Sequence, residues 1–339
     1  MSFPPRLSFT LTNACNLRCR MCGQWSETGY VRCGGVARPE MGLADWKRLV
    51  DEGAEHGVSF VLVRGGEPFL FPGIIELLEH LAAKGIATSV DTNGTMLERY
   101  AADLVRLGDN IELTVSVDGP EEVHDEVRGV PGCFRRMERG VAALRAAEDA
   151  AGKKLRRAIC FTISPYSLRG LAEMPAVARR LGMPIHVVPY YYFPDAVGQA
   201  YEAELRTLGC EAFSWRGFHH PASGIDFDEF LPLFRRYQAG LAPDERAVFM
   251  DLGEEDYRTW FADATTPVGS TACWNLDGLL DIQPDGEANF CVDFPDYPIG
   301  NVASATIEAL WNGARAERLR EHRRRKPLAI CHRCGAKYI

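Results

Sequence analysis

The chain has 339 residues, of which 46% are hydrophobic and 25% are charged, so its composition is that of a globular protein rather than a disordered or repetitive one. Its formal net charge is −8, which argues against a nucleic-acid partner bound by bulk positive charge. No apolar run approaches the roughly 18 residues of a membrane helix, and the N-terminal residues contain no signal-peptide core. We therefore expect a cytoplasmic protein with neither a membrane nor a nucleic-acid partner.

Alternating strand and helix patterns occupy the first 190 residues. Short apolar or alternating segments predict strands at 6–12, 58–63, 86–91, 111–117, 158–163 and 185–189. Apolar residues at helical spacing predict intervening helices at 41–56, 74–84, 96–107, 134–151 and 168–181. Repeated strand–helix units imply an α/β fold with a parallel sheet covered by helices, either an open sheet or an incomplete barrel, and with functional loops after the strands.

The remaining residues break this pattern. Residues 191–266 are rich in aromatic side chains and contain a predicted helix at 226–239, so this region is either a substrate-facing connection or a helical bridge. Further along, Pro284-Asp285-Gly286 predicts a tight turn between two strands, which a helix at 306–320 follows. We predict three regions, which cover 1–190, 191–266 and 267–339.

Eleven cysteines are present, and most of them gather near the two ends of the chain. Cys15, Cys19 and Cys22 lie within eight residues, directly after the first predicted strand. Three thiolates in so short a loop can bind one metal centre and leave a coordination position open for a substrate or cofactor. A structural zinc site would need a fourth ligand, for which Cys33 is the nearby candidate.

The Cys-x3-Cys-x2-Cys motif after a first strand, with Gly-Gly-Glu-Pro at residues 65–68 after the second, resembles the radical S-adenosylmethionine (SAM) superfamily. The resemblance covers residues 6–190 and implies a partial (β/α)6 barrel. It also implies a [4Fe–4S] cluster whose open iron chelates SAM. An electron from a flavodoxin- or ferredoxin-type reductant then cleaves SAM to a 5′-deoxyadenosyl radical, which abstracts hydrogen from a substrate.

The resemblance assigns the contacts to SAM residue by residue. Met21 would lie near the adenine ring, and residues 65–68 would bind the amino group through their backbone and the Glu67 carboxylate. Arg128 would pair with the carboxylate of SAM, because a guanidinium binds a carboxylate well, although a surface salt bridge is the alternative. The expected SAM-binding residues are Met21, Gly65, Gly66, Glu67, Pro68, Asn93, Ser116, Asp118 and Arg128.

A second cysteine set surrounds the predicted hairpin and resembles the auxiliary-cluster domains of radical SAM enzymes, called SPASM and, in a shorter form, twitch. Its members are Cys273, Cys291, Cys331 and Cys334. Because five residues follow Cys334, we expect a single, fully ligated [4Fe–4S] cluster with an electron-transfer role, as in twitch enzymes. A structural zinc ribbon is the alternative. Cys160, on the fifth predicted strand, fits no pattern and is expected to be a core residue.

These features predict a radical SAM oxidoreductase of the dehydrogenase type. Its expected substrate is a sugar- or cyclitol-like small molecule, with the second cluster as electron acceptor. The candidate bases are His186, Tyr190, Tyr192 and Asp195. The first alternative is a ribosomal-peptide maturase; because 14 residues precede Cys15, a leader peptide would need another recognition site. The second alternative, a non-catalytic iron–sulfur or zinc-stapled binding protein, is disfavoured by the open three-cysteine motif.

Overall fold

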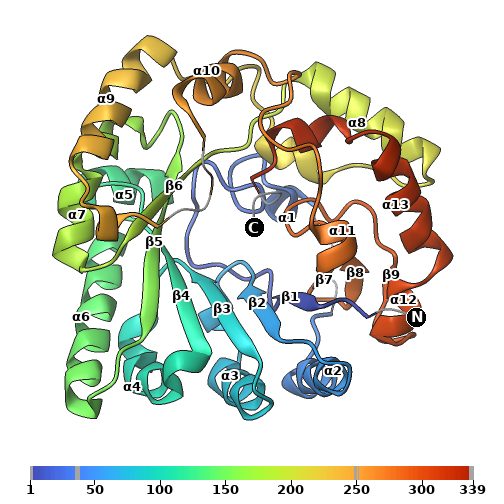
Figure 1. Cartoon of the computed structure of the whole chain (residues 1–339), viewed down its shortest axis with the longest axis horizontal. Helices are drawn as coiled ribbons and strands as arrows, with labels where there is room; N and C mark the ends of the chain where they lie inside the picture. Colours follow the sequence, from blue (N-terminus) through green and yellow to red (C-terminus); the bar gives the residue numbers. More distant parts are fainter. Residues whose placement is uncertain (1–2, 35–38, 248–249, 251, 336–339) are drawn as a thin grey trace.

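The computed structural model describes residues 3–34, 39–247, 250 and 252–335. Within these ranges the core is one sheet of nine strands, ordered β6-β5-β4-β3-β2-β1-β7-β8-β9. Figure 1 shows this sheet curving into an arc with helices on its outer side. The strands are β1 (Arg6–Thr10), β2 (Phe60–Arg64), β3 (Ala87–Thr92), β4 (Ile111–Ser116), β5 (Arg156–Ile163), β6 (Ile185–Pro189), β7 (Leu280–Ile282), β8 (Glu287–Asn289) and β9 (Gly300–Asn301).

Strands β1 to β6 are parallel and neighbour one another in chain order, which confirms the predicted α/β partial barrel. Helices connect them on the outside because each presents an apolar stripe to the sheet. On the first long helix, for example, Trp46, Leu49 and Val50 are buried, and the Trp46 ring lies 4.9 Å from that of Phe9 on β1. The barrel helices are α2 (Leu43–Glu55), α3 (Ile74–Ala83), α4 (Leu97–Leu107), α5 (Glu121–Arg128), α6 (Cys133–Ala151) and α7 (Met174–Leu181).

Two details of the barrel differ from the sequence prediction. The predicted helix at 168–181 begins as a 3₁₀ helix, Leu168–Glu173, and becomes α-helical only as α7. Helix α5 was not predicted, because its buried face combines Val123 and Val127 with the polar residues His124 and Arg128. A helix that buries polar side chains lacks the apolar period on which such a prediction depends.

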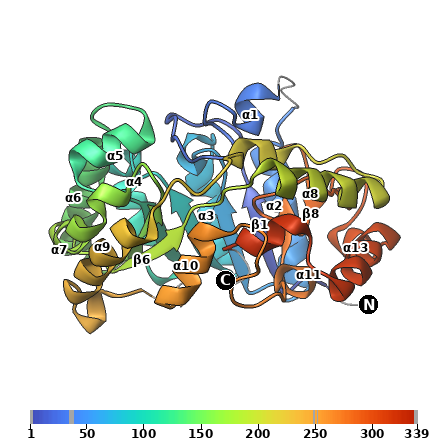
Figure 2. The ribbon, with the colours of Figure 1, turned by 90° about the horizontal axis from the view of Figure 1, so that it is seen from above.

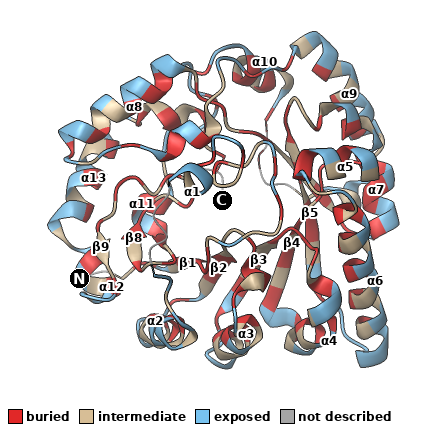
Figure 3. Cartoon of the chain, turned by 180° about the vertical axis from the view of Figure 1, so that it is seen from behind, coloured by how far each residue is buried: buried red, intermediate tan, exposed pale blue. Residues whose placement is uncertain are grey.

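Residues 191–266 form a helical layer beside the open side of the arc (Figure 1). The predicted helix at 226–239 is α9 (Phe227–Ala239), while α8 (Asp195–Thr207) and α10 (Glu254–Ala262) were not predicted. The aromatic residues at 190–266 fall into two groups. Tyr190, Tyr191 and Phe218 line a cavity, whereas others, such as Phe230 and Tyr257, form a core with ring centroids 5.1 Å apart. Figure 3 shows the same division, with buried residues on the inner faces of these helices and exposed ones outside.

The predicted hairpin is present as β7 and β8, and it joins the barrel sheet. Strand β7 pairs parallel with β1, in the register Leu7↔Leu280, and antiparallel with β8. The buried Asp281 carboxylate fixes this junction, because it accepts hydrogen bonds from Ser8 Oγ (2.6 Å), Gln283 Nε2 (2.6 Å) and Asn289 Nδ2 (3.3 Å). The C-terminal hairpin is therefore continuous with the barrel, although the predicted boundary at residue 267 remains a prediction.

The helix predicted at 306–320 is two helices, α12 (Ile307–Trp311) and α13 (Ala314–Arg325), divided at Gly313, which forms the N-cap of α13. Two short helices complete the described elements. Helix α1 (Tyr30–Cys33) lies between β1 and α2, and α11 (Asn275–Gly278) lies between α10 and β7. Figure 2 shows α8 beside the C-terminal segment, where Glu204 pairs with Lys326 at 2.8 Å and accepts the Ala329 amide at 2.9 Å. None of the helices in the described ranges is long and apolar enough to cross a membrane.

Candidate active site

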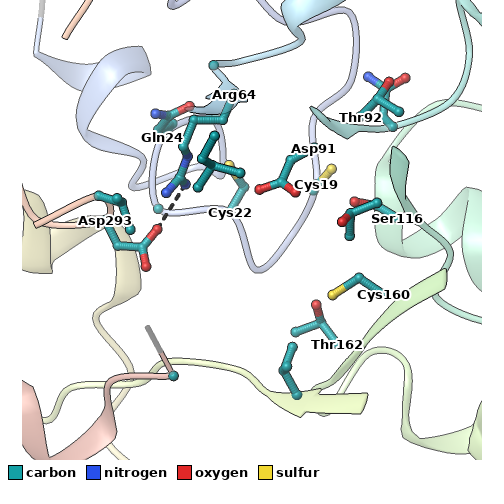
Figure 4. Close-up of a pocket in the computed structure, with 18 of the residues that line it drawn as sticks. Cys19, Cys22, Gln24, Arg64, Asp91, Thr92, Ser116, Cys160, Thr162 and Asp293 are labelled. Atoms are coloured by element: carbon teal, nitrogen blue, oxygen red, sulfur yellow. Dashed lines mark hydrogen bonds and ion pairs between the residues drawn. The ribbon is translucent and has the colours of Figure 1, made fainter. Parts of the chain in front are cut away.

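A cavity of about 660 Å³ fills the interior of the partial barrel. The wall of this cavity consists of strand residues, and along each strand they alternate with apolar residues that are buried in the core. On β4, for example, Ile111, Leu113 and Val115 are buried under helices, and the intervening polar residues face the cavity. Figure 4 shows several of these polar groups converging from different strands. The inward residues of β2 to β6 include Arg64, Ser89, Asp91, Glu112, Thr114, Ser116, Cys160, Thr162 and His186.

The loop after β1 brings Cys15, Cys19 and Cys22 to one end of this cavity, together with Met21. Two backbone hydrogen bonds fix the loop against α5: the Arg18 amide donates to the Arg128 carbonyl at 3.0 Å, and the Arg20 amide to the Val127 carbonyl at 2.9 Å. Burial raises the pKa values of Cys15 and Cys19 to about 11. Buried thiols of this kind ionise when a metal supplies compensating positive charge.

The side chains fit an iron–sulfur cluster better than a single metal ion. One zinc ion holds each thiolate sulfur at about 2.3 Å, and therefore draws its ligands close together. The described histidine, cysteine, aspartate and glutamate side chains form no group of three with such a geometry. A [4Fe–4S] cluster is larger, takes cysteine thiolates as its usual ligands and accepts a wider spacing between them.

Gly65 and Gly66 line the cavity where β2 ends, and the backbone of the cysteine loop lies directly against them. A Cβ atom on Gly66 would lie 2.2 Å from the Ala14 carbonyl oxygen, and one on Gly65 would lie 2.7 Å from that of Thr12. The loop is also hydrogen-bonded to this segment, since the Gly66 amide donates to Thr12 O at 2.7 Å. The two glycines are therefore required for the close approach of the cysteine loop.

The side chains of Glu67 and Pro68 do not line the cavity. The Glu67 carboxylate is fully buried and accepts hydrogen bonds from Thr92 Oγ1 (2.8 Å), Asn93 N (2.8 Å) and Phe69 N (3.2 Å). Burial, opposed by these hydrogen bonds, raises its pKa to about 7. In this structure the carboxylate ties the end of β2 to the end of β3.

Asn93 lines the cavity, and its Nδ2 donates to Asn16 Oδ1 at 2.9 Å, which joins β3 to the cysteine loop. Arg128 also lines the cavity, but its salt bridge is buried rather than on the surface: Nη2 lies 2.7 Å from Asp118 Oδ2. Its Nη1 lies 3.6 Å from Cys19 Sγ, and its Nε has no hydrogen-bond partner among the described residues. The guanidinium therefore keeps a donor for a ligand, while Asp118 lies behind it and outside the cavity lining.

Several cavity residues were not predicted as site residues. Arg64, Asp91 and Asp293 line the cavity, and so does Cys160, which the sequence placed in the core (Figure 4). Burial raises the pKa of the Cys160 thiol to about 12. The signal was available in the strands, because polar residues stand at every second position of β4, where a fully buried parallel strand is apolar throughout.

Of the four candidate bases, His186 and Tyr190 line the cavity, and Tyr192 and Asp195 do not. The Tyr192 hydroxyl donates to Trp260 O at 2.6 Å, and Asp195 is 73% exposed on α8 beside His219. Burial raises the pKa of Tyr190, whose hydroxyl donates to Ser223 O. Burial lowers the pKa of His186 to about 4, so its imidazole is neutral near pH 7 and can accept a proton.

The C-terminal cysteines lie close behind the cavity lining. Burial raises the pKa of Cys291, and the nearby thiols of Cys334 and Cys273 and the Asp293 carboxylate raise it further. None of the four cysteines lines the cavity, but residues next to two of them do: Val292 and Asp293 follow Cys291, and Gly335 follows Cys334. The second cysteine set is therefore separated from the cavity by its own flanking residues.

Arg333 anchors the Cys331–Cys334 segment to α10. Its side chain is fully buried, and its guanidinium donates to the carbonyl oxygens of Thr259 (3.0 Å), Trp260 (3.1 Å) and Asp263 at the C-terminal end of that helix. Each of these carbonyls also accepts a second hydrogen bond, from the Asp263 amide, the Tyr192 hydroxyl and the Thr266 amide respectively, so the arginine adds a charged donor at the end of the helix. No local pattern indicates this role, because the residues that Arg333 contacts are about 70 positions away in the chain.

Two family models match the chain. The model of the radical SAM superfamily matches residues 9–149, and the SPASM model, described as an iron–sulfur cluster-binding domain, matches residues 273–335. The first match contains the three-cysteine loop and the second contains all four C-terminal cysteines. The second match also favours cluster ligands over a zinc ribbon.

Curated relatives match different shares of the chain. The sporulation killing factor maturation protein SkfB of Bacillus subtilis is 30% identical over 94% of this chain and 67% of its own length. An AdoMet-dependent heme synthase of Methanosarcina barkeri is 31% identical over 57% of this chain. The chain spans about half the length of that heme synthase, 51%.

Among solved structures, SuiB of Streptococcus suis, crystallised with the precursor peptide SuiA, superposes with a TM-score of 0.65. The superposition covers 99% of this chain and 72% of SuiB, at 15% sequence identity. This likeness concerns the fold, from the barrel through the C-terminal hairpin.

Proposed function

The chain belongs to the radical SAM superfamily and carries a SPASM domain, and from this premise we propose that it modifies a peptide by hydrogen abstraction. Its cofactors are SAM and [4Fe–4S] clusters. The observation that carries the proposal is one cavity with Cys15, Cys19 and Cys22 at one end and the flanks of the second cysteine set, Asp293 and Gly335, at another. A substrate in this cavity would lie between the two sets.

We assign the first cluster to Cys15, Cys19 and Cys22 and a second to the C-terminal cysteines. When bound there, the first cluster and SAM would supply the 5′-deoxyadenosyl radical needed to remove a hydrogen atom from the substrate. Around it, Gly66 offers close backbone contact and Asn93 offers an amide group. Arg128 offers a guanidinium that suits the carboxylate of SAM.

The relatives favour a peptide substrate over the sugar- or cyclitol-like molecule that the sequence first indicated. SkfB, named as a maturation protein of the sporulation killing factor, matches 94% of this chain, including the region after the barrel. The heme synthase match covers 57% of the chain. Because the match to SkfB extends over nearly the whole chain, it includes the residues proposed to face the substrate as well as those proposed to bind SAM.

We further propose that the reaction is an oxidation in which His186 accepts a proton. Its imidazole lines the cavity and is neutral near pH 7, whereas burial raises the pKa of the Tyr190 phenol, which therefore stays protonated and cannot accept a proton. An acceptor for the electron would be the second cluster, and a flavodoxin- or ferredoxin-type protein would be the external reductant. Replacing His186 with glutamine is expected to lower product formation more than 5′-deoxyadenosine formation.

The first test measures 5′-deoxyadenosine after anaerobic reconstitution with iron, sulfide, SAM and a chemical reductant. The wild type is expected to form it, and the Cys15→Ala, Cys19→Ala, Cys22→Ala variant is expected to form none. Peptides encoded by short reading frames beside the gene, and a panel of sugars and cyclitols, are then offered separately. A mass change in a peptide supports the proposal, and a change confined to a sugar or cyclitol contradicts it.

A further inference from the structure

Tyr191 connects two of the three segments that carry the second cysteine set. Its hydroxyl donates to Asp293 Oδ2 at 3.1 Å and accepts the Gly335 amide at 3.2 Å. Asp293 stands two residues after Cys291, and Gly335 directly follows Cys334. One hydroxyl group therefore fixes two cysteine-bearing segments that are more than 40 residues apart in the chain.

The same chain of contacts continues to the SAM side of the cavity. The other carboxylate oxygen of Asp293 accepts from Arg64 Nη2 at 2.9 Å, an ion pair that Figure 4 shows at the edge of the cavity. Arg64 is the last residue of β2 and directly precedes Gly65 and Gly66. Burial alone would lower the pKa of Arg64, but the carboxylates of Asp293 and Asp91 raise it, so the guanidinium stays charged.

Charges and hydrogen bonds in such a position act strongly on a neighbouring metal centre. The reduction potential of an iron–sulfur cluster depends on nearby charge, on hydrogen bonds and on solvent exposure. The three groups here are shielded from water: Arg64 and Asp293 expose 21% and 16% of their side chains. Electrostatic effects weaken less over distance in such surroundings than at an open surface.

We propose that Tyr191 is a positioning residue which holds the Arg64–Asp293 ion pair against the second cysteine set and thereby sets the reduction potential of its cluster. The inference rests on the proposed function, because it takes those cysteines as cluster ligands. Asp293 adds negative charge and makes reduction harder, whereas Arg64 and the Tyr191 hydroxyl offset that charge. The potential therefore depends on all three groups being held in one arrangement.

A substitution of Tyr191 can separate this role from simple packing. The ring of Tyr191 lies 5.5 Å from that of Phe218 and 5.8 Å from that of Phe294, centroid to centroid. Tyr191→Phe keeps these contacts and removes only the hydroxyl. Tyr190→Phe is the matched control, because that neighbouring hydroxyl donates to Ser223 O instead of to a cysteine-bearing segment.

The experiment measures the midpoint potential of the second cluster by redox titration followed by electron paramagnetic resonance. The full chain carries Cys15→Ala, Cys19→Ala and Cys22→Ala in every sample, so the signal comes from the C-terminal set alone. We expect Asp293→Asn to raise the potential, and Arg64→Gln and Tyr191→Phe to lower it. Arg64→Lys retains the charge and is expected to stay near the parent, as is Tyr190→Phe.

The possible outcomes separate the two proposals. If the parent variant binds no iron after reconstitution, the assignment of a second cluster is wrong and the inference is wrong with it. If the parent holds a cluster but Tyr191→Phe leaves the potential unchanged, or Asp293→Asn and Arg64→Gln leave it unchanged or shift it in the same direction, the inference alone is overturned. Iron content is determined for each variant, and a variant that loses its iron is replaced by a second uncharged substitution at the same position, Asp293→Ser or Arg64→Met.

Discussion

The two cysteine sets of this protein are built in opposite ways. The first is local: three thiols within eight residues of one loop, all lining the cavity. The second is assembled from three segments that span 62 residues, and its thiols lie behind the cavity lining. This difference suits the roles proposed for them, because a site that exchanges a bound molecule has to be open, whereas a site that only transfers electrons can be enclosed.

Different forces hold the two sets. The first is held by backbone contacts, the close approach to Gly65 and Gly66 and the hydrogen bonds to α5. The second is held by buried side chains, Asp281 under the hairpin and Arg333 at the end of α10. Substitutions that disturb one kind of support and not the other therefore test whether the sets are independent.

The largest expected effect comes from removing each set entirely. Without the first set, 5′-deoxyadenosine formation is expected to stop, and iron is expected to fall from about eight to about four per chain. Without the second set, iron is again expected to fall to about four, but reductive SAM cleavage should persist. Iron and sulfide analysis with a cleavage assay measures both. Loss of all iron on removal of either set would contradict their independence.

Replacing Arg333 with methionine is expected to give the next largest effect. The change removes three hydrogen bonds that a charged donor makes to carbonyls at the end of α10, which we expect to cost about 3–5 kcal/mol of unfolding free energy in total. Denaturant unfolding measures this cost, and iron analysis should show the second cluster lost and the first retained. Arg325→Met, at an exposed position on α13, is the control and should stay within about 0.5 kcal/mol of the wild type. Equal stability of the two variants would contradict the anchoring role.

A smaller effect, confined to the first set, is expected from Gly66→Ala. The added Cβ would lie 2.2 Å from the Ala14 carbonyl oxygen, so the cysteine loop must shift. Such overpacking costs about 1–3 kcal/mol. SAM affinity, measured by equilibrium dialysis, should fall, while the potential of the second cluster stays unchanged. The control is Gly253→Ala, whose Cβ would meet Asp256 Oδ2 at an ordinary 3.6 Å; a similar loss of SAM affinity there would contradict the explanation.

The smallest effect is a pH dependence at the junction between the hairpin and the barrel. Burial, opposed by Arg64 and by hydrogen bonds, raises the pKa of Asp281 from 3.8 to about 6. The folded chain therefore holds this proton more tightly than the unfolded chain. Its contribution to stability is fully present below pH 3.8 and is lost as the pH rises through about 6.

Asp281→Asn is expected to flatten the decline of unfolding free energy across that interval, where one such group contributes a slope of at most about 1.4 kcal/mol per pH unit. Denaturant titrations of the cluster-free chain at several pH values measure the slope. Exposed Asp244→Asn is the control and should keep the wild-type slope. An unchanged slope in Asp281→Asn would show that this carboxyl is not the group responsible.

The features that could be predicted from the sequence are those determined by residues close together in the chain. The strand–helix repeats, the three-cysteine loop and the turn at Pro284-Asp285-Gly286 each depend on local spacing. The pairing of β7 with β1 does not, because Leu7 and Leu280 carry no local mark of their contact. Helices α8 and α10 were missed although their buried residues, such as Val197, Tyr201 and Leu205 on α8, do stand at helical spacing.

Only part of the candidate site could be predicted, again because local motifs are visible in the sequence and long-range contacts are not. Cys15, Cys19, Cys22 and Met21 were found from one motif and do line the cavity. Arg64 and Asp293 were missed, because their ion pair joins residues 229 positions apart. Glu67 belongs to a recognised motif, yet its carboxylate is turned toward β3, which only the three-dimensional hydrogen bonding reveals.

The central place of β1 has a consequence for biosynthesis. This strand is paired with β2 on one side, about 50 residues later in the chain, and with β7 on the other, about 270 residues later. While the ribosome is still adding the intervening residues, β1 presents an unpaired edge, directly before the cysteine loop. A cluster inserted into the nascent chain would therefore bind to a loop whose strand is paired on one side only. A chaperone or scaffold protein that shields the unpaired edge would raise the yield of enzyme that carries the cluster.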